Sequence, residues 1–530
     1  MVNSFMQSRF GERRHDNCSQ RQKGRTMAYD SLRAFVDALQ KAGELHRIDA
    51  AVDPYLEIGE ISDRVVKAGG PALLFTNVRG SRFPVLTNQF GTRRRMARAL
   101  GANDLEDVAA RIRKFLDVAL PANALEGAAK LLSMAPLAAA IPKTVSHGSC
   151  QDVVLPEPDL GQLPILTTWP LDAGPFITLP LVITRDPKTG RPNVGMYRMQ
   201  VYNARETGMH WQRHKQGRAH AQASGGRIAV AVAIGADPAL TYAATAPLPP
   251  IVDEFAFAGV LRGKPVRLVQ CKTVDLKVPA DAEFVLEGYV DNTDLRVEGP
   301  FGDHTGVYSL ADRYPTFHVQ CITHRRDPIY AATIVGKPPM EDAWLGKATE
   351  RIFLPLLQMV VPEIVDMNLP VEGGFHNLAI VSIRKSYPGQ AKKVMNALWG
   401  LGHMMMLTRV LVVVDADVDV QDTRAVAWFV LNNLDAQHDV VMMPGPVDDL
   451  DHGSYTPALG VKVGVDATRK SAAEGYTREW PPDMVMDQAV RERVTRRWNV
   501  YGLDRIERSL QGDAWSGQGP EALRRLLRRK

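Results

Sequence analysis

The stretch EFVLEGYVDNTDLRVEGPFGDHTG, residues 283–306, joins a strand-like run to a polar turn in the centre of the chain. Residues 283–289 have the apolar and aromatic character of a buried strand. The turn at 298–306 places two carboxylates, Glu298 and Asp303, five positions apart. Proline fixes φ and glycine permits tight backbone geometry, so the turn can direct both acids toward one point. Most exposed turns of this composition are only turns, so the surrounding sequence has to decide between the two interpretations.

Further strand-like runs surround this stretch on both sides. They are separated by long connections, and many strands with long connections predict a barrel or a sandwich. The runs lie at 181–184, 194–202, 227–234, 266–271, 317–323 and 330–334.

The two flanks of the strand-rich centre have mixed patterns. Residues 27–130 predict a small α/β region, with helical spacing near 32–39, 58–66 and 104–120 and strands at 72–78 and 83–86. Beyond the centre, helix (347–361), strand (377–383), helix (390–401), strand (410–414) and helix (422–431) alternate. Alternation of this kind predicts a parallel sheet with covering helices, so the fold class is mixed α/β.

The composition excludes several classes of protein. The chain has 530 residues, 45% hydrophobic and 23% charged, which is ordinary for a globular protein. Of the formal net charge of +5, residues 1–26 carry +4 and residues 521–530 another +4, which leaves the body at −3. A nucleic-acid groove through the body is therefore not supported. No apolar run reaches the roughly 20 residues of a membrane span.

The ends of the chain are basic and carry predictions of their own. We expect 1–26 to be a disordered leader that lies outside the enzyme, with Met27 a candidate start. The end of the chain, within 501–530, reads as a short basic helix. Its leucines and arginines suit either contact with anionic lipid or a solvated helix end.

Familiar catalytic and metal motifs are absent from the sequence. The four cysteines are far apart without a CxxC pair, which fits a reducing cytoplasm. There is no GxGxxG after a strand, no P-loop, no HExxH and no GxSxG. Asp415, Asp417 and Asp419 resemble the start of a calcium loop, but Val420 and Val426 stand where that loop needs Gly and Glu.

Two more stretches concentrate polar groups inside the strand-rich centre: NVGMYR at 193–198 and MHWQRH at 209–214. Paired carboxylates near an arginine form a plausible acid–base and anion-holding set. Together with VLTNQFGT, DEFAFAGVLRG, VPADAEFVLEGYV, EGPFGDHTGVY, PEIVDMNLP and GVKVGVDATRK, these stretches resemble the UbiD family of prenylated-flavin decarboxylases from about Tyr29 to Trp498. The resemblance implies an N-terminal α/β domain (27–130), a central split β-barrel that binds flavin and metal (131–335) and a C-terminal α/β domain used in oligomerisation (336–500).

The resemblance also implies where the cofactor is held. The family's ligands to Mn²⁺ or Mg²⁺ fall on Asn193, His214 and Glu254, a set that suits a hard cation bridging a phosphate; K⁺ is a further candidate ion. His210 stands where related enzymes often have Arg, and Lys215-Gln216 where Arg-Gly is common. The implied flavin contacts are Met196, Tyr197, Arg198, His210, Trp211, Gln212, Lys215 and Gln216.

The family's catalytic acid–Arg–acid set falls on Glu298, Arg198 and Asp303. Loss of CO₂ from an aromatic carboxylate leaves a carbanion that no side chain can stabilise, so the prenylated FMN must serve as electron sink. We infer that Arg198, held by Glu298, orients the carboxylate or the flavin, and that Asp303 donates the proton that replaces CO₂. A dry pocket and a nearby carboxylate would raise the pKa of Asp303 for this purpose.

The leading functional prediction is decarboxylation of 4-hydroxy-3-polyprenylbenzoate to 2-polyprenylphenol in ubiquinone biosynthesis, which Asp at position 303 favours by resemblance. The alternative is a decarboxylase, reversible or not, of a small aromatic or heteroaromatic acid. A flavin-binding protein without this chemistry is a third interpretation, which the acid–Arg–acid set disfavours. Expected partners are further copies of the chain as a dimer or hexamer, a flavin prenyltransferase that supplies the cofactor, and a membrane surface; the expected location is the cytoplasm, or peripherally the inner face of the cell membrane.

Overall fold

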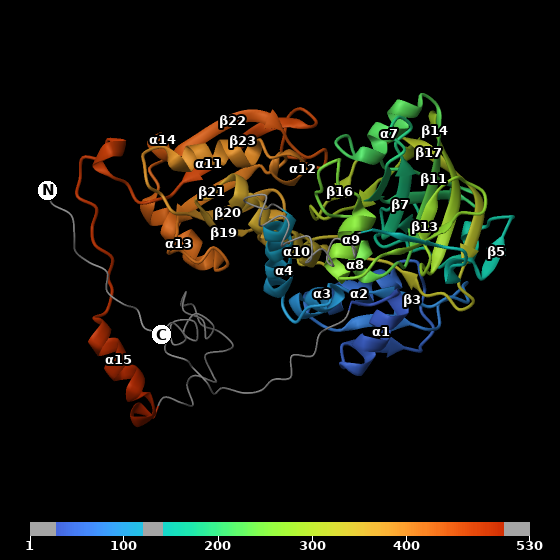
Figure 1. Ribbon diagram of the computed structural model, residues 1–530, viewed down its shortest axis with the longest axis horizontal. Coiled ribbons are helices and arrows are strands. Elements are labelled where there is room, and N and C mark those ends of the chain that lie inside the picture. Colours follow the sequence, from blue (N-terminus) through green and yellow to red (C-terminus); the bar gives the residue numbers. More distant parts are fainter. Residues whose placement is uncertain (1–27, 120–140, 503–530) are drawn as a thin grey trace.

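The computed structural model describes residues 28–119 and 141–502, which form three units (Figure 1). The N-terminal unit, blue in Figure 1, lies below the strand-rich central unit, and the C-terminal unit lies on the other side of helix α10 (Asp342–Val360). The predicted leader (1–26) and all but the first two residues of the predicted basic tail (501–530) fall outside the described residues. Within those residues, no helix combines the length and the apolar character that crossing a bilayer requires.

The N-terminal unit is a small sheet covered by helices. Its sheet has the order β1-β2-β3-β18, and β18 (Tyr330–Ala331) comes from the end of the central segment and pairs parallel with β3. The run at 330–334, predicted as part of the central sheet, therefore belongs to the N-terminal one. The other elements are α1 (Leu32–Lys41), β1 (Leu45–Ile48), α2 (Glu57–Lys67), β2 (Ala72–Phe75), β3 (Val85–Thr87), α3 (Arg93–Ala99) and α4 (Leu105–Ala119).

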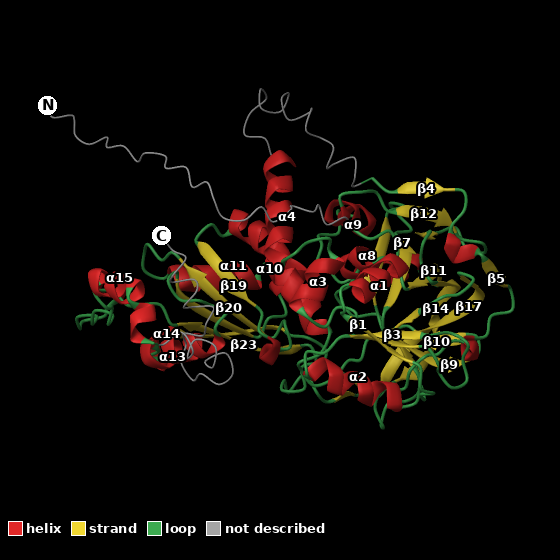
Figure 2. Cartoon of the chain, turned by 90° about the horizontal axis from the view of Figure 1, so that it is seen from below, coloured by secondary structure: helices red, strands yellow, loops and turns green. Residues whose placement is uncertain are grey.

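The central unit is built on a nine-stranded antiparallel sheet that curls into an open half-barrel (Figure 2). Its two longest strands, β14 (Phe284–Glu298) and β17 (Asp312–His324), pair along most of their length. This confirms the predicted open barrel and mixed α/β class. The remaining strands are β5 (Val153–Leu155), β6 (Phe176–Ile177), β7 (Pro180–Arg185), β8 (Pro192–Met196), β9 (Met199–Asn203), β10 (Glu206–Gly208) and β11 (Arg227–Ile234).

Shorter elements surround this sheet and carry several of the polar side chains. A second sheet has the order β13-β12-β4, and β15 pairs with β16 in the turn that follows β14. These elements are β4 (Lys143–Val145), α7 (Gln216–Ser224), α8 (Pro238–Ala243), α9 (Glu254–Arg262), β12 (Arg267–Gln270), β13 (Lys277–Pro279), β15 (Phe301–Gly302) and β16 (Tyr308–Ser309).

The C-terminal unit has a five-stranded sheet of order β19-β20-β21-β23-β22. Strands β20, β21 and β23 are parallel and both edge strands are antiparallel, so the predicted β/α alternation is confirmed. Its elements are β19 (Ile364–Asn368), β20 (Leu378–Ile383), α11 (Gln390–Trp399), α12 (Gly402–Met405), β21 (Val410–Asp415), α13 (Thr423–Asn433), α14 (Ala436–Asp439), β22 (Val440–Pro446) and β23 (Leu459–Asp466). The helix α15 (Gln488–Arg496) follows this unit in the chain and lies apart from its sheet in Figure 1.

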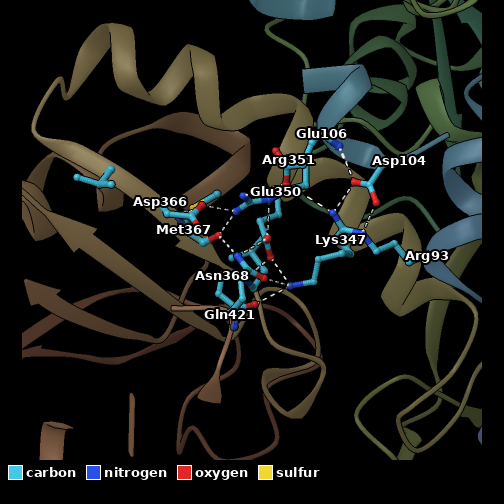
Figure 3. A network of polar contacts seen from close by, with 12 residues as sticks. Arg93, Asp104, Glu106, Lys347, Glu350, Arg351, Asp366, Met367, Asn368 and Gln421 are labelled. Carbon is cyan, nitrogen blue, oxygen red and sulfur yellow. Dashed lines mark hydrogen bonds and ion pairs between the residues drawn. The ribbon is translucent and has the colours of Figure 1, made fainter. Parts of the chain in front are cut away.

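A network of buried charges on α10 joins the C-terminal unit to the rest of the chain (Figure 3). Glu350 is fully buried and accepts hydrogen bonds from Lys347 Nζ (2.6 Å) and from the backbone N–H of Leu369 (2.6 Å). Arg351 pairs with Asp366 of β19 at 2.7 Å and reaches Glu106 of α4 at 3.5 Å. The same helix thus holds both a strand of the C-terminal sheet and a helix of the N-terminal unit.

We expect the substitution Glu350→Gln to lower the free energy of unfolding by roughly 3 kcal/mol, because the buried Arg351 and the partly buried Lys347 would lose the carboxylate that they share. Urea unfolding followed by circular dichroism measures the change. Glu60→Gln is the matched control: its ion pair with Arg64 is exposed on both sides, so the loss should stay below about 1 kcal/mol. Equal unfolding midpoints for the two variants would contradict this account of the junction.

Candidate active site

Arg198, between β8 and β9, is the centre of a buried ion cluster. Its Nε donates to Glu298 Oε1 at 2.8 Å and its Nη1 to Asp303 Oδ2 at 2.5 Å. Nη2 donates to Ser309 Oγ at 3.0 Å, and the guanidinium lies 4.8 Å from the centroid of the Phe301 ring. The three residues that the sequence analysis grouped as acid–Arg–acid are thus in direct contact.

The turn after β14 brings the two carboxylates to Arg198. Glu298 ends β14, and Gly299 has φ +89°, a left-handed conformation that favours glycine. Gly302 packs against the indole of Trp169 so closely that a Cβ there would lie 2.2 Å from the ring. The turn is therefore fixed by local backbone geometry and by packing as well as by the ion pairs.

The charges of this cluster set the pKa values of both acids. Burial alone would raise the pKa of Glu298, but hydrogen bonds from His210 and Arg198 outweigh it and lower the pKa to about 2. Burial would likewise raise the pKa of Asp303, yet the hydrogen bond from His304 and the charge of Arg198 hold it well below its usual range. The expectation of a raised pKa for Asp303 is therefore wrong for this arrangement, since its neighbours are cations.

His210 and Glu298 form a second contact in the cluster. The His210 Nδ1 lies 3.1 Å from Glu298 Oε2, and the imidazole packs in a tilted arrangement on the Tyr314 ring with 4.2 Å between the ring centroids. Because a carboxylate only accepts hydrogen bonds, Nδ1 carries the proton. Burial and the neighbouring Arg198 lower the pKa of His210, so the ring is neutral.

The proposed metal ligands come from the start of β8 (Asn193), the turn before α7 (His214) and the first residue of α9 (Glu254). The Glu254 carboxylate accepts the backbone N–H of Val194 at 3.0 Å, which places it beside Asn193. His214 precedes Lys215, whose ammonium interacts with Glu254. Asn193 Nδ2 and His214 Nε2 are buried and have no hydrogen-bond partner among the described residues. Burial raises the pKa of Glu254 to about 7. The unpartnered His214 Nε2, the Glu254 carboxylate and the amide oxygen of Asn193 are groups that fit a divalent cation.

A cavity of about 380 Å³ between the central and C-terminal units gathers most of the predicted cofactor contacts. Glu298 is buried behind Arg198, and Trp211 lines a neighbouring cavity of about 860 Å³ that shares Arg198 and His210. Gln216 begins α7 and lines neither cavity. The predicted residues that do line the smaller cavity are Met196, Tyr197, Arg198, His210, Gln212, His214, Lys215 and Asp303.

Two histidines that the sequence analysis did not single out extend the ion cluster. His304 Nδ1 lies 2.9 Å from Asp303 Oδ1, and His304 Nε2 lies 2.9 Å from Nε2 of His376. His376 belongs to the C-terminal unit, in the loop between β19 and β20, and lines the smaller cavity. His304 stands inside the quoted turn and could have been noticed there. His376 is 72 residues away in the sequence, and no local pattern connects the two.

Family models match all three units of the chain. They describe the 3-octaprenyl-4-hydroxybenzoate carboxy-lyase N-terminal domain at residues 36–113, its Rift-related domain at 143–338 and its C-terminal domain at 343–467. An uncharacterized protein of Archaeoglobus fulgidus is 54% identical over 478 residues, which cover 89% of this chain and 98% of that protein.

Solved structures match over nearly their whole length. The vanillic acid decarboxylase of Sedimentibacter hydroxybenzoicus, in closed form, superposes with a TM-score of 0.80 at 26% identity, covering 89% of this chain and 99% of that one. The UbiD-class enzyme HmfF from Pelotomaculum thermopropionicum, in complex with FMN, gives 0.71 at 31% identity over 85% and 97%. An evolved dimeric form of HmfF, in complex with prFMN, gives 0.70 at 29% over 87% and 100%. With all three of its units matched, the chain belongs to the UbiD family of prenylated-flavin-dependent carboxy-lyases.

Proposed function

We propose that this chain decarboxylates a small aromatic or heteroaromatic carboxylic acid. The observation that carries the proposal is the cavity of about 380 Å³, which has Arg198 and Asp303 in its wall and also gathers most of the predicted flavin contacts. A polyprenyl tail would need a long apolar channel in addition to this volume. The similarity to the vanillic acid decarboxylase supports the same substrate class.

The residues of the cavity have separate roles in this proposal. When bound, the prenylated FMN supplies the electron sink for the departing CO₂. Asn193, His214 and Glu254 would hold a Mn²⁺ or Mg²⁺ ion, with K⁺ a further candidate, and such an ion would offset the negative charge of the flavin phosphate. Arg198 orients the substrate carboxylate or the flavin, and Glu298 keeps Arg198 in place. Asp303 delivers the proton to the carbon that loses CO₂.

A polyprenylated 4-hydroxybenzoate is the second candidate substrate. It is favoured by the description of the matching family models and by three exposed apolar side chains, Leu295, Val307 and Leu310, that line the larger cavity beside Arg198. An apolar tail could follow these side chains. Most other residues of that cavity are polar or charged, which is why we place this substrate second.

The proposed assembly rests on apolar side chains that are exposed on the C-terminal unit. Large apolar side chains are exposed on α13 and on the β22–β23 edge of the C-terminal sheet. Exposed apolar surface of this kind marks protein contacts, so we propose that copies of the chain associate through this unit. The exposed residues are Trp428, Leu431, Met442, Leu459 and Val461. A flavin prenyltransferase is the proposed source of the cofactor.

The substrate class is tested by CO₂ release from the enzyme loaded with prenylated FMN. We expect turnover of benzoates and heteroaromatic acids without a tail, at rates at least about tenfold above those for acids carrying a prenyl chain, because a cavity of about 380 Å³ that also has to hold the flavin leaves little room for the chain. Faster turnover of the prenylated acids would move the assignment to the second candidate. If neither set of acids releases CO₂, the proposed function is contradicted.

The role of Asp303 is tested by Asp303→Asn, which keeps the size of the side chain and removes its proton transfer. Decarboxylation should fall by at least about 100-fold. Flavin absorbance and metal content should stay at the wild-type level, since Asp303 touches neither Asn193 nor Glu254 in the network of hydrogen bonds. The exposed Asp327→Asn is the control and should turn over normally. An Asp303→Asn enzyme with full turnover would refute the role.

The metal site is tested by His214→Ala. The variant should bind less Mn²⁺ and retain less flavin during purification, because the imidazole lone pair that faces no protein donor is lost. Elemental analysis and the flavin absorbance measure both effects. His147→Ala, at an exposed position, serves as the control. Unchanged metal and flavin content in His214→Ala would show that another residue completes the site.

A further inference from the structure

The contacts of Asp303 leave it without a proton of its own. Its Oδ2 accepts a hydrogen bond from Arg198 Nη1. Its Oδ1 accepts the backbone N–H of His304 at 2.8 Å and lies 2.9 Å from His304 Nδ1. Every one of these contacts stabilises the carboxylate form. A group that is to protonate a carbon from this position has to receive a proton from a neighbour at the moment of transfer.

The hydrogen bonds define which nitrogens carry protons. A carboxylate only accepts, so His304 Nδ1 is protonated. The 2.9 Å contact between the two Nε2 atoms needs one proton between them. Either His304 is an imidazolium that donates to a neutral His376, or both rings are neutral and His376 donates. The two arrangements differ by one proton, so the pair of rings can store one beside Asp303.

The electrostatic surroundings favour the first arrangement. Burial would lower the pKa of His304, but the hydrogen bond and charge of Asp303 outweigh it and raise the pKa, with Asp342 of α10 and Asp448 of the loop after β22 adding to the effect. Burial and the charge of His304 lower the pKa of His376 to about 4. The positive charge therefore rests on His304, and His376 is the acceptor.

We propose that His304 is the proton reservoir of Asp303 and that His376 of the C-terminal unit positions the His304 ring by accepting its Nε2–H. This inference rests on the proposed decarboxylation and adds two residues to it. Neither histidine has to touch the substrate for this role, since both act through Asp303.

The proton transfer balances without a further co-reactant. As the carbon–carboxyl bond breaks, the carbon takes one proton from Asp303, and Asp303 takes the Nδ1 proton of His304. One carboxylate and one imidazolium become CO₂, the protonated product and a neutral imidazole. A proton from solvent then restores the imidazolium. Because His376 comes from a different unit from His304, the reservoir is complete only when the two units are in the arrangement seen here.

The loop that carries His376 has an unusual backbone conformation next to the His304 ring. Phe375 has φ +52°, a conformation rarely adopted by residues other than glycine, and its ring lies 5.3 Å from that of His304. Backbone strain at a site is kept only where the surroundings enforce it, and this strained residue directly precedes His376.

The first test measures protonation directly, without cofactor. Protein labelled with ¹³C at histidine Cε1 is titrated by NMR, with the His304 signal assigned from its loss in His304→Asn. We expect His304 to titrate above the ordinary histidine value of about 6.5. In His376→Leu, which lacks an acceptor, its proton affinity should fall by about tenfold, whereas His376→Gln, whose amide oxygen accepts, should retain it. The exposed His438→Asn is the control.

The second test uses the loaded enzyme. Because protonated His304 is the active form, the wild-type rate should decline as pH rises through the pKa of His304. In His304→Asn the rate should fall by at least about tenfold, and its decline with rising pH should disappear. In His376→Leu the decline should move to lower pH with kcat reduced. KM should stay nearly unchanged at pH values below the shifted pKa, where His304 still carries its proton, and His376→Gln should restore most of kcat.

Three results would overturn the inference: a His304 that titrates at or below the ordinary value, identical His376→Leu and His376→Gln enzymes, or a fully active His304→Asn enzyme beside an inactive Asp303→Asn enzyme. All three leave the proposed function standing. Absence of turnover in the wild type would remove the proposed function, while the NMR titration would still report on the histidine pair.

Discussion

A buried guanidinium is tolerated only where acceptors take up its N–H groups, because an unpaired buried charge costs several kcal/mol. Arg198 meets this requirement with Glu298, Asp303 and the Ser309 hydroxyl. These partners lie at the end of β14, in the following turn and on β16, so the cluster determines the path of the chain from 298 to 309. The positive charge of Arg198 therefore has two roles: it belongs to the proposed active site, and its ion pairs hold the turn in place.

Close packing keeps the surrounding walls rigid. A Cβ at Gly195 would lie 2.4 Å from the Tyr197 hydroxyl, and one at Gly217 would lie 2.4 Å from the Trp211 ring. The Tyr197 and Trp211 rings in turn meet edge to face at 5.1 Å. Small residues at these positions let the aromatic rings approach the backbone beside Asn193 and Lys215. The proposed phosphate and metal region is thus built on a packed core, where side chains have little freedom to shift.

The sequence was sufficient wherever a feature depends on neighbours along the chain. The alternation after residue 336 and the grouping of Glu298 with Asp303 are local patterns, and the structure has both. Features set by long-range pairing could not be predicted in this way. The pairing of Tyr330 with β3, the contact between His304 and His376 and the cationic surroundings of Asp303 all depend on which segments meet after folding. The prediction of a raised pKa for Asp303 was wrong because its nearest partners are His304 and Arg198, and not the second carboxylate.

The protonation of His304 also bears on how the cavity receives an anion. With His304 charged, Arg198 and His304 balance Glu298 and Asp303, and the cluster has no net charge. With His304 neutral, the same cluster carries one negative charge beside the position where a substrate carboxylate is expected, and like charges repel strongly where water is excluded. A single proton therefore serves two steps: it makes the site neutral toward the incoming acid, and it is then the proton that replaces CO₂. Since neutral CO₂ leaves and the proton is consumed, the cluster is negative after the reaction, and it accepts the next substrate once solvent has returned the proton to His304.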